Sequence, residues 1–440
     1  MLVQIPKNIC KKGSTSVPIL DKINSVIGII FFACYFYQIV YLFIAYLTKD
    51  KEPPKTEKLA KIAVLIAARN EERVVGNLVD TLLMQDYKKD AYRVFLVADN
   101  CTDNTAAVAK EHGATVYERR NCKERGKGYA LDFLIKNIWQ DFGHGEFDGF
   151  LVFDADNLAE PDFLTEINKT FALGYDVVSS YRNSKNYAQS WLAAGQGMWF
   201  IRDARILNKA RMKIGSCTFV SGTGFLFSRA LCEKNGGWPF HTLTEDGEFT
   251  SANAVGRVKT GYCGTAEFYD EQPVTLSESW KQRLRWCKGG LQIFRLYLGK
   301  LLLGIFKRGG LACFDIAMCL APAYLISVVA VLVNLVGFAL MPFFGTYAGF
   351  FVSLSKIAIG VFGAYAMLFI FSLAATVSEW KKLHAGAFKK ILYTFTFPLF
   401  IFSFIPIALA ALFKRVEWTA IAHNDTATLS DLHGGKDKND

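Results

Sequence analysis

Four long apolar stretches constrain the fold of this chain more than any other feature. The first stretch, Ile23 to Leu47, is almost continuously apolar and aromatic, and three more follow near Ile316–Met341, Ala348–Val377 and Ile391–Phe413. At about 1.5 Å per residue, a helix over any of them could cross a hydrocarbon core of about 30 Å. Apolar residues make up 52% of the chain, which is high for a purely soluble protein. We therefore expect a multi-pass membrane protein with four spans.

The regions between these stretches have different compositions. A polar segment, residues 1–22, precedes the first stretch, and no small-residue cleavage pattern follows it, so we interpret that stretch as an anchor. Residues 55–275 have the composition of an ordinary globular domain, and residues 414–440 form a polar tail. The ten cysteines form neither a CxxC pair nor a Cys/His cluster, so we expect no zinc site and no disulfide framework. A reducing cytosol suits the globular domain.

Short buried strands alternate with helices in the globular domain. This alternation predicts an α/β domain with a largely parallel sheet, helices on both faces and a ligand crevice at the carboxyl ends of the strands. The strands that we expect are Ile62–Ala67, Arg93–Ala98, Thr115–Arg119, Phe150–Phe153 and Val177–Ser180. Functional side chains should therefore follow directly after strands.

An amphipathic pattern covers residues 277–302, between the globular domain and the second apolar stretch. Apolar residues recur there at alternating spacings of four and three, with basic residues between them, as is typical of a helix. The apolar positions are Trp280, Leu284, Cys287, Leu291, Phe294 and Leu298. Basic and aromatic residues favour a helix in the membrane interface, although a helix that faces the core of the globular domain is the alternative.

The charge of the chain bears on its partners and its orientation. A net charge of +10 is compatible with nucleic acid, an anionic membrane or a polyphosphate substrate. Because no nucleic-acid-binding module is recognisable, we expect a lipid bilayer and no nucleic acid. With four spans and a cytosolic globular domain, Lys381 and Lys382 lie inside, as the positive-inside rule prefers. Lys11, Lys414 and Arg415 would then lie outside, against that rule.

Two carboxylates, Asp154 and Asp156, close an apolar strand. Their spacing places both on one side of an extended chain, where the crevice of an α/β sheet opens. Carboxylate oxygens suit Mg²⁺ or Mn²⁺, which can neutralise the charge on a diphosphate leaving group. The alternative is that these carboxylates cap the next helix.

A second acidic pair, Glu245 and Asp246, follows Thr244 and opens a helix that we expect to run through Ala254. Asp246 is the candidate base, because a carboxylate opposite a leaving group can accept a proton from an acceptor hydroxyl. A helix N-terminus should keep the pKa of Asp246 low. N-terminal capping is the alternative role for this pair.

Further candidates lie on the amphipathic helix and near the first strands. Gln282 and Arg285 share one face of the helix, and Trp286 offers an aromatic plane for a sugar ring. A basic helix that binds lipid headgroups is the alternative. Asp99 can accept a hydrogen bond from a base or a ribose, and Lys127 offers a cation near a diphosphate. A turn or capping role would explain either of these last two residues alone.

Taken in order, these motifs resemble the processive branch of glycosyltransferase family 2, which includes cellulose, hyaluronan and poly-N-acetylglucosamine synthases. The resemblance covers Ile62 to Phe294 and includes the Asp-x-Asp and Gln-x-x-Arg-Trp motifs. It implies metal ligation by Asp154 and Asp156, catalysis by Asp246 and Glu245, and acceptor binding by Trp286, Gly222 and Thr223. It implies nucleotide-sugar contacts from Ala68, Asn70, Glu72, Asp99, Lys127, Asp154, Gln282 and Arg285. The opening loop departs from the family, with Ala67 and Ala68 where proline and an aromatic residue are common.

The resemblance implies a GT-A type nucleotide-diphosphosugar transferase domain joined to an α-helical transmembrane region. The expected reaction is an inverting transfer, with Mg²⁺ or Mn²⁺, from UDP-glucose or UDP-N-acetylglucosamine to a growing polysaccharide through a β-linkage. The expected location is a bacterial plasma membrane, with the catalytic domain in the cytosol. A non-processive enzyme that adds one sugar to a membrane lipid is the nearest alternative. A transporter would carry ionisable residues inside its spans, but Asp315 and Lys356 lie near expected span ends.

Overall fold

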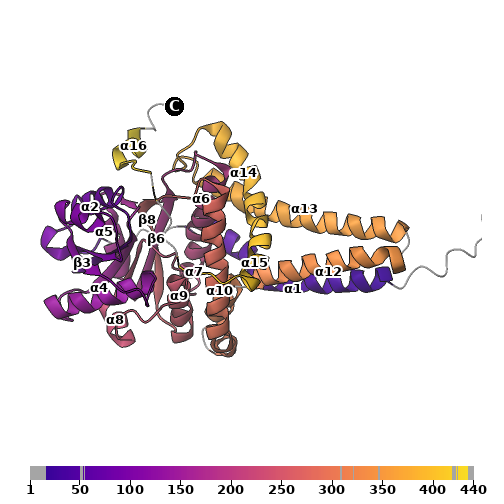
Figure 1. Ribbon diagram of the computed structural model, residues 1–440, viewed down its shortest axis with the longest axis horizontal. Helices are drawn as coiled ribbons and strands as arrows, with labels where there is room; N and C mark the ends of the chain where they lie inside the picture. The colour runs from indigo at the N-terminus through magenta and orange to yellow at the C-terminus, as the bar shows by residue number, and fades with distance from the viewer. Residues whose placement is uncertain are drawn as a thin grey trace, which may run out of the picture.

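The protein consists of an α/β domain and a group of long helices that extends from one side of it (Figure 1). The computed structural model describes residues 16–49, 53, 55–307, 310–320, 322–344, 347–418, 423 and 425–434. Most of the expected polar segment 1–22, with Lys11, lies outside the described residues, as does the end of the polar tail after residue 434.

An eight-stranded sheet with the order β3-β2-β1-β4-β7-β6-β8-β5 forms the centre of the α/β domain. Its strands are β1 (Ile62–Ala68), β2 (Tyr92–Asp99), β3 (Thr115–Arg119), β4 (Gly149–Asp154), β5 (Leu158–Ala159), β6 (Val177–Ser184), β7 (Phe225–Ser228) and β8 (Thr260–Asp270). The five expected strands are present, and β3-β2-β1-β4 are parallel as predicted. The other half is mixed, because β7 runs antiparallel to β4 and β6, and β5 runs antiparallel to β8.

Helices bury both faces of the sheet. Ile62, Val64 and Ile66 of β1 face one core, whereas Ala63 and Leu65 face the other, as the two-residue period of a strand requires. The first core is covered by α2 (Val75–Leu83), α3 (Thr105–Glu111) and α5 (Phe163–Phe171), and the second by α4 (Lys127–Phe142), α8 (Arg229–Asn235) and α9 (Glu245–Gly256).

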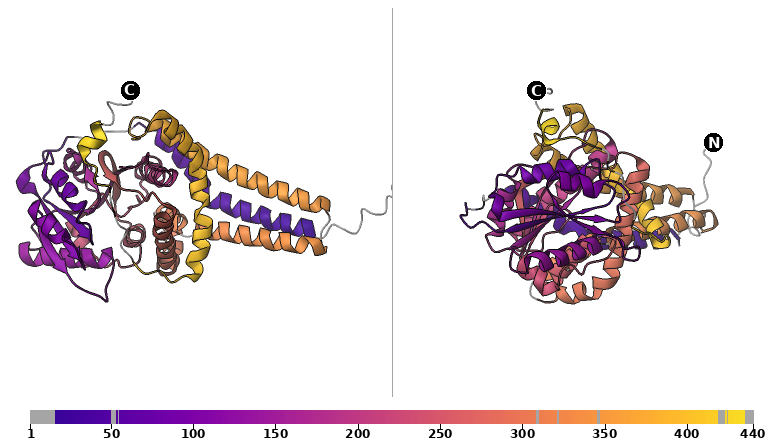
Figure 2. Two further views of the ribbon diagram at one scale, coloured as in Figure 1. Left: turned by 45° about the horizontal axis from the view of Figure 1, so that its top comes forward. Right: turned by 60° about the vertical axis from the view of Figure 1, so that its left-hand side comes forward.

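Three long apolar helices extend together from the α/β domain (Figures 1 and 2). They are α1 (Ser16–Leu47), α12 (Pro322–Phe344) and α13 (Tyr347–Ser378). The expected span Ile316–Met341 is divided, because its first residues belong to α11 (Gly310–Leu320), which packs against the α/β domain. Among the described residues, Lys22–Leu47 in α1, Leu354–Ser378 in α13 and Ala387–Phe413 could each cross a membrane by length and composition, and the bent pair α11–α12 would add a fourth span if it forms one span.

A buried ion pair joins the apolar helices α1 and α11 to the α/β domain. The Nε atom of Arg211, in α7 (Lys209–Lys213), lies 2.8 Å from Oδ2 of Asp315 in α11. Tyr37 and Tyr41 of α1 each donate a 3.0 Å hydrogen bond to the same carboxylate. Asp315 therefore fixes α1 and α11 to the domain and is not exposed to lipid.

The last apolar stretch forms α14 (Ala387–Phe402) and α15 (Phe404–Phe413), which run across the base of the extended helices (Figure 2). Near its start, Lys389 donates a 3.0 Å hydrogen bond to the carbonyl of Ala188, and near its end the carbonyl of Ala411 accepts one from Lys288 at 3.0 Å. In the middle, Phe400 lies so close to Gly195 that a Cβ there would be 2.5 Å away. Both ends therefore contact the same globular part of the molecule.

Candidate active site

Three carboxylates meet at the carboxyl edge of the sheet. Asp154 ends β4, Asp156 lies in the turn that follows, and Asp270 ends β8. One ligand oxygen from each lies within 4.8 Å of the others, so the three can share one ion. This set of hard oxygen donors fits Mg²⁺ or Mn²⁺. Asp270 was not predicted, because β8 was not recognised as a strand.

Buried polar side chains hold these carboxylates in place. Asn157 donates hydrogen bonds to Asp270 at 2.7 Å and to Asp156 at 3.3 Å. The hydroxyl of Thr223 accepts a 2.9 Å hydrogen bond from the backbone N–H of Asp154. Thr223, which the sequence assigned to the acceptor, therefore lies buried behind the acids. The capping alternative for Asp156 is not realised, because the next helix, α5, has Asp162 at its N-cap.

Lys127 links the three carboxylates of Asp154, Asp156 and Asp270, called the metal acids below, to the loop before β7. It is the first residue of α4, and its Nζ atom bonds the carboxylate of Asp154 and donates to the carbonyl of Gly222 at 2.9 Å. Burial opposes the charge of Lys127, but Asp154 and Glu245 raise its pKa above the usual value. Burial likewise opposes the charge of Asp154, but Lys127 lowers the pKa of that carboxyl overall. The Lys127–Asp154 pair is therefore ionised.

The second acidic pair lies beside this loop. Gly222 has a φ of 82°, which favours glycine, and a Cβ there would be 3.4 Å from Oδ2 of Asp246. Burial raises the pKa of Asp246, and burial together with Asp246 raises the pKa of Glu245 to about 7. The expectation that a helix N-terminus keeps the pKa of Asp246 low is wrong, because burial outweighs the hydrogen bond from the N–H of Gly247. Within the described residues, Thr244 makes no side-chain capping bond.

Helix α10 (Leu276–Ile305) brings the Gln-x-x-Arg-Trp residues to this site. Arg285 donates a 3.2 Å hydrogen bond to the carbonyl of Leu243, just before the acidic pair. Gln282 accepts a 2.7 Å hydrogen bond from Gln196. The half-buried ring of Trp286 meets Phe200 edge-on, with the ring centroids 5.9 Å apart. The charge of Arg285 lowers the pKa of both acids against the effect of burial, which places its guanidinium near Glu245 and Asp246.

The expected nucleotide residues near the first two strands tie two loops together. Ala68 pairs with Ala98 where β1 and β2 end side by side. The side chain of Asn70 accepts a 2.8 Å hydrogen bond from the N–H of Thr102. In the same way, Glu72 accepts a 2.9 Å hydrogen bond from the N–H of Asn104. These contacts position the loops that follow β1 and β2.

Asp99 is the candidate contact for the nucleotide base. It is buried, and it accepts hydrogen bonds from Arg119 at 2.8 Å and from Asn100 at 2.9 Å. Burial raises the pKa of Asp99, although Arg119 opposes this shift. Asp99 is therefore held in place at the end of β2 by Arg119 and Asn100.

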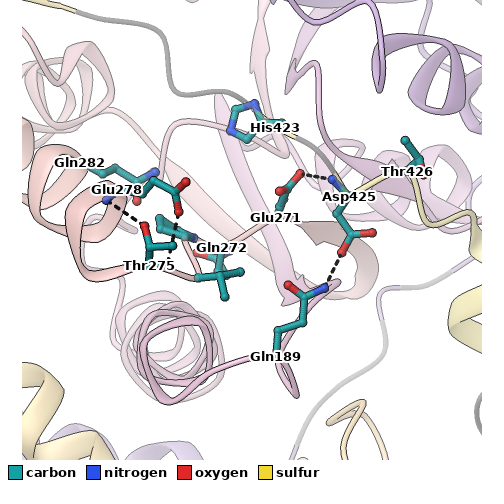
Figure 3. A pocket seen from close by; sticks show the side chains of 11 residues that line it. Gln189, Glu271, Gln272, Thr275, Glu278, Gln282, His423, Asp425 and Thr426 are labelled. Carbon is teal, nitrogen blue, oxygen red and sulfur yellow. Dashed lines mark hydrogen bonds between the residues drawn. The ribbon is translucent and has the colours of Figure 1, made fainter.

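A cavity of about 380 Å³ opens next to Gln282, the one expected nucleotide-sugar residue among those that line it. Gln282, Glu271 and Gln272 line it together with His423 and Asp425 from the C-terminal segment (Figure 3). Nδ1 of His423 lies 2.9 Å from a carboxylate oxygen of Glu71. Burial would lower the pKa of His423, but Asp156, Glu71 and Glu271 raise it to about 10. The sequence analysis missed His423, because nothing in a polar tail indicates that it folds back onto the domain.

The fold and these acids define a GT-A type glycosyltransferase. A family model described as "Glycosyltransferase like family 2" matches residues 60–289, and the chain belongs to that family. The predicted family, fold class and enzyme class are thereby confirmed.

Two curated relatives and one solved structure illustrate the similarity. The β-monoglucosyldiacylglycerol synthase of Synechocystis is 28% identical over 262 residues, which are 57% of this chain and 53% of that protein. The poly-β-1,6-N-acetyl-D-glucosamine synthase of Staphylococcus aureus is 23% identical over 280 residues, 63% of this chain and 64% of the relative. The chain thus spans between half and two thirds of each relative. The mannosyltransferase PcManGT of Pyrobaculum calidifontis has the same fold, with a TM-score of 0.58 at 18% identity, over 88% of this chain and 98% of that one.

Proposed function

We propose that this protein transfers a sugar, with inversion, from UDP-glucose or UDP-N-acetylglucosamine to a growing polysaccharide at the membrane. The observation that carries this proposal is the meeting of the metal acids, the Asp246 carboxylate and the Gln-x-x-Arg-Trp helix beside the membrane helices. A nucleotide sugar with a divalent ion is the ligand class found with PcManGT, which was solved with GDP-mannose and Mn²⁺.

The donor side would hold a divalent ion and the diphosphate. Asp154, Asp156 and Asp270 would bind Mg²⁺ or Mn²⁺, and this ion would neutralise charge on the leaving diphosphate. Lys127 and Arg285 add two cations that can hold the phosphates. Ala68, Asn70, Glu72 and Asp99 would shape the nucleotide side of the pocket.

On the acceptor side, Asp246 would act as the general base. It would take the proton from an acceptor hydroxyl as that oxygen bonds to the anomeric carbon on the face opposite the diphosphate. The bond to the phosphate oxygen breaks, its electron pair leaves with UDP, and an α-linked donor gives a β-linkage. Burial raises the pKa of Asp246, which makes it a better proton acceptor than an exposed aspartate. Trp286 would support the acceptor sugar.

We further propose that α1, α12 and α13 cross the membrane, while α10, α11, α14 and α15 lie along its cytosolic surface. The contacts at both ends of the α14–α15 pair support this arrangement. It places Lys414 and Arg415 on the cytosolic side, as the positive-inside rule prefers, whereas Lys11 stays outside in either arrangement. A C-terminal tag should then be accessible to protease only in inside-out vesicles, whereas protection there would support four spans.

A second candidate acceptor is a membrane lipid that receives one sugar. It is favoured by the similarity to β-monoglucosyldiacylglycerol synthase, which at 28% identity exceeds the 23% identity to the poly-N-acetylglucosamine synthase. The position of Trp286 on a helix beside the membrane serves either acceptor.

One experiment tests the donor and both acceptors. The purified protein in nanodiscs, with Mg²⁺ or Mn²⁺, receives a panel of UDP-sugars with or without diacylglycerol, and UDP release and product size are measured. A ladder of long products supports the polysaccharide, and a lipid with one added sugar supports the second candidate. If no UDP-sugar yields UDP with either ion, the proposed function is wrong.

A further inference from the structure

The C-terminal segment folds back onto the donor side of the α/β domain. After α15 the chain places the ring of Trp418 5.3 Å from the guanidinium carbon of Arg69, in the loop that follows β1. His423 then bonds Glu71 in the same loop. The amide of Asn77, in the following helix, donates a 3.1 Å hydrogen bond to the carbonyl of Thr426. The C-terminal segment therefore contacts the loop that follows β1 twice and helix α2 once.

The far end of the segment is anchored as well. Leu432 of α16 (Leu429–Gly434) is buried against Leu158 and Tyr269, which lie on the paired strands β5 and β8. The side chain of His433 lies 2.9 Å from the carboxylate of Glu160. An apolar contact and a hydrogen bond thus fix the end of the segment at β5 and β8.

Between these two anchors, the segment forms one wall of the cavity. The backbone N–H of Asp425 donates a 3.1 Å hydrogen bond to Glu271, and its carboxylate accepts one from Gln189 at 3.3 Å (Figure 3). The cavity keeps a volume of about 380 Å³ with the segment in place. Ligand pockets have volumes of about 300–1,000 Å³, so the segment leaves room for a ligand.

His423 is the residue of this wall that faces the acids. It bonds Glu71, which is buried, and the charges of Asp154 and Asp156 interact with its ring. Glu71 is also fixed from its backbone, because its N–H donates a 2.8 Å hydrogen bond to Thr105. His423 therefore connects the C-terminal segment to the loop that the family resemblance assigns to the nucleotide.

We propose that residues 423 and 425–434 complete the donor pocket and that His423, through Glu71, is a positioning residue for a nucleoside diphosphate bound with a divalent cation. This inference rests on the proposed function, because it deepens the assignment of the same donor site. The contacts hold the segment against the rim of the cavity and leave the cavity open. The proposed role of the segment is therefore to tighten donor binding. A plug that competes with the donor would instead weaken binding.

Calorimetric titration of the full-length protein with UDP and Mn²⁺ tests this role. His423→Ala should weaken UDP binding about tenfold, the lower end for the loss of a hydrogen bond to a charged group. His423→Gln keeps a donor for Glu71 and should recover part of that loss. His144→Ala is the matched control, because His144 is exposed and stacks on Trp139 near the opposite end of α4 from Lys127. This control should bind UDP as the unmodified protein does.

A second measurement does not depend on the point variants. Backbone amides of residues 425–434 should exchange hydrogen more slowly when UDP and Mn²⁺ are bound, because the segment lies against the filled pocket. Unchanged UDP affinity in His423→Ala, with unchanged exchange, would overturn the inference. Tighter binding in His423→Ala would identify the segment as a plug. If the unmodified protein binds neither UDP nor GDP with Mn²⁺, the proposed function itself fails.

Discussion

Replacing Asp246 by asparagine removes the proposed base and changes little else. The amide keeps the volume of the side chain and its hydrogen-bonding capacity, so the close approach to Gly222 is preserved. Burial already opposes the negative charge of Asp246, and a neutral amide does not carry that desolvation cost. We therefore expect Asp246→Asn to fold and to bind UDP with unchanged affinity.

The expected loss is in turnover. General base catalysis contributes about 10²–10⁴-fold, so turnover should fall by at least about 10²-fold. At about 1.4 kcal/mol per tenfold, this loss corresponds to a barrier higher by about 2.7 kcal/mol or more. The structure favours the full effect, because Lys127, Arg285 and Arg182 all favour the charged form of Asp246 and thus its role as an anion.

The assay separates catalysis from donor binding. UDP release is measured with saturating donor and acceptor, and UDP affinity is measured by calorimetry with Mn²⁺. Asp90→Asn is the matched control, because Asp90 is exposed and lies just before β2, at the edge of the sheet opposite the site. Near-normal turnover in Asp246→Asn would refute the assignment of the base. Loss of UDP affinity with a normal rate at saturation would instead place Asp246 on the donor side.

Three further predictions test the metal, the acidic pair and the acceptor platform. Asp156→Ala and an excess of chelator should each abolish transfer, because both remove the ion from the diphosphate; full activity in chelator would show that the enzyme needs no metal. Because burial raises the pKa of Asp246, the rate should fall on acidification at a higher pH than an ordinary aspartate base would give. Glu245→Gln removes a neighbouring negative charge and should move this fall to lower pH; an unmoved profile would exclude coupling of the pair. Trp286→Ala should weaken acceptor binding by about 1–3 kcal/mol and give shorter products, while slow hydrolysis of the UDP-sugar persists. Unchanged product length would instead indicate that Trp286 only anchors the helix to the membrane.

The sequence predicted β1, β2, β3, β4 and β6, of which all but β3 are largely buried on both faces, and missed β5, β7 and β8. A continuous apolar run, as in β1 or β4, identifies such a strand by itself. In contrast, β5 has two residues and β7 has four, too short for a periodic pattern. The strand β8 contains glycine and polar residues and becomes a strand through its pairing with β6. Asp270 was missed for the same reason, since its place at the end of a strand was not recognisable.

Hydropathy could not distinguish a helix that crosses a membrane from one that lies along it. The α14–α15 stretch is as apolar as α13, and the hydrogen bonds that link its two ends to Ala188 and Lys288 are what support the proposed surface orientation. The pKa of Asp246 is a similar case, because the sequence shows the helix N-terminus but not the degree of burial. Local signals therefore identify candidate residues, whereas tertiary contacts determine the burial and orientation of these side chains.

The direction of α14–α15 and the place of His423 depend on each other. A helix that crossed the membrane after α13 would leave the C-terminal segment on the side opposite the α/β domain, and His423 could not reach Glu71. Because α15 ends against Lys288 of α10, the following residues begin beside the site and can extend along its donor face. The proposed three-span arrangement thus keeps the polar tail on the side of the donor pocket. If a C-terminal tag is found outside the cell, this result would therefore contradict both the three-span arrangement and the role of His423.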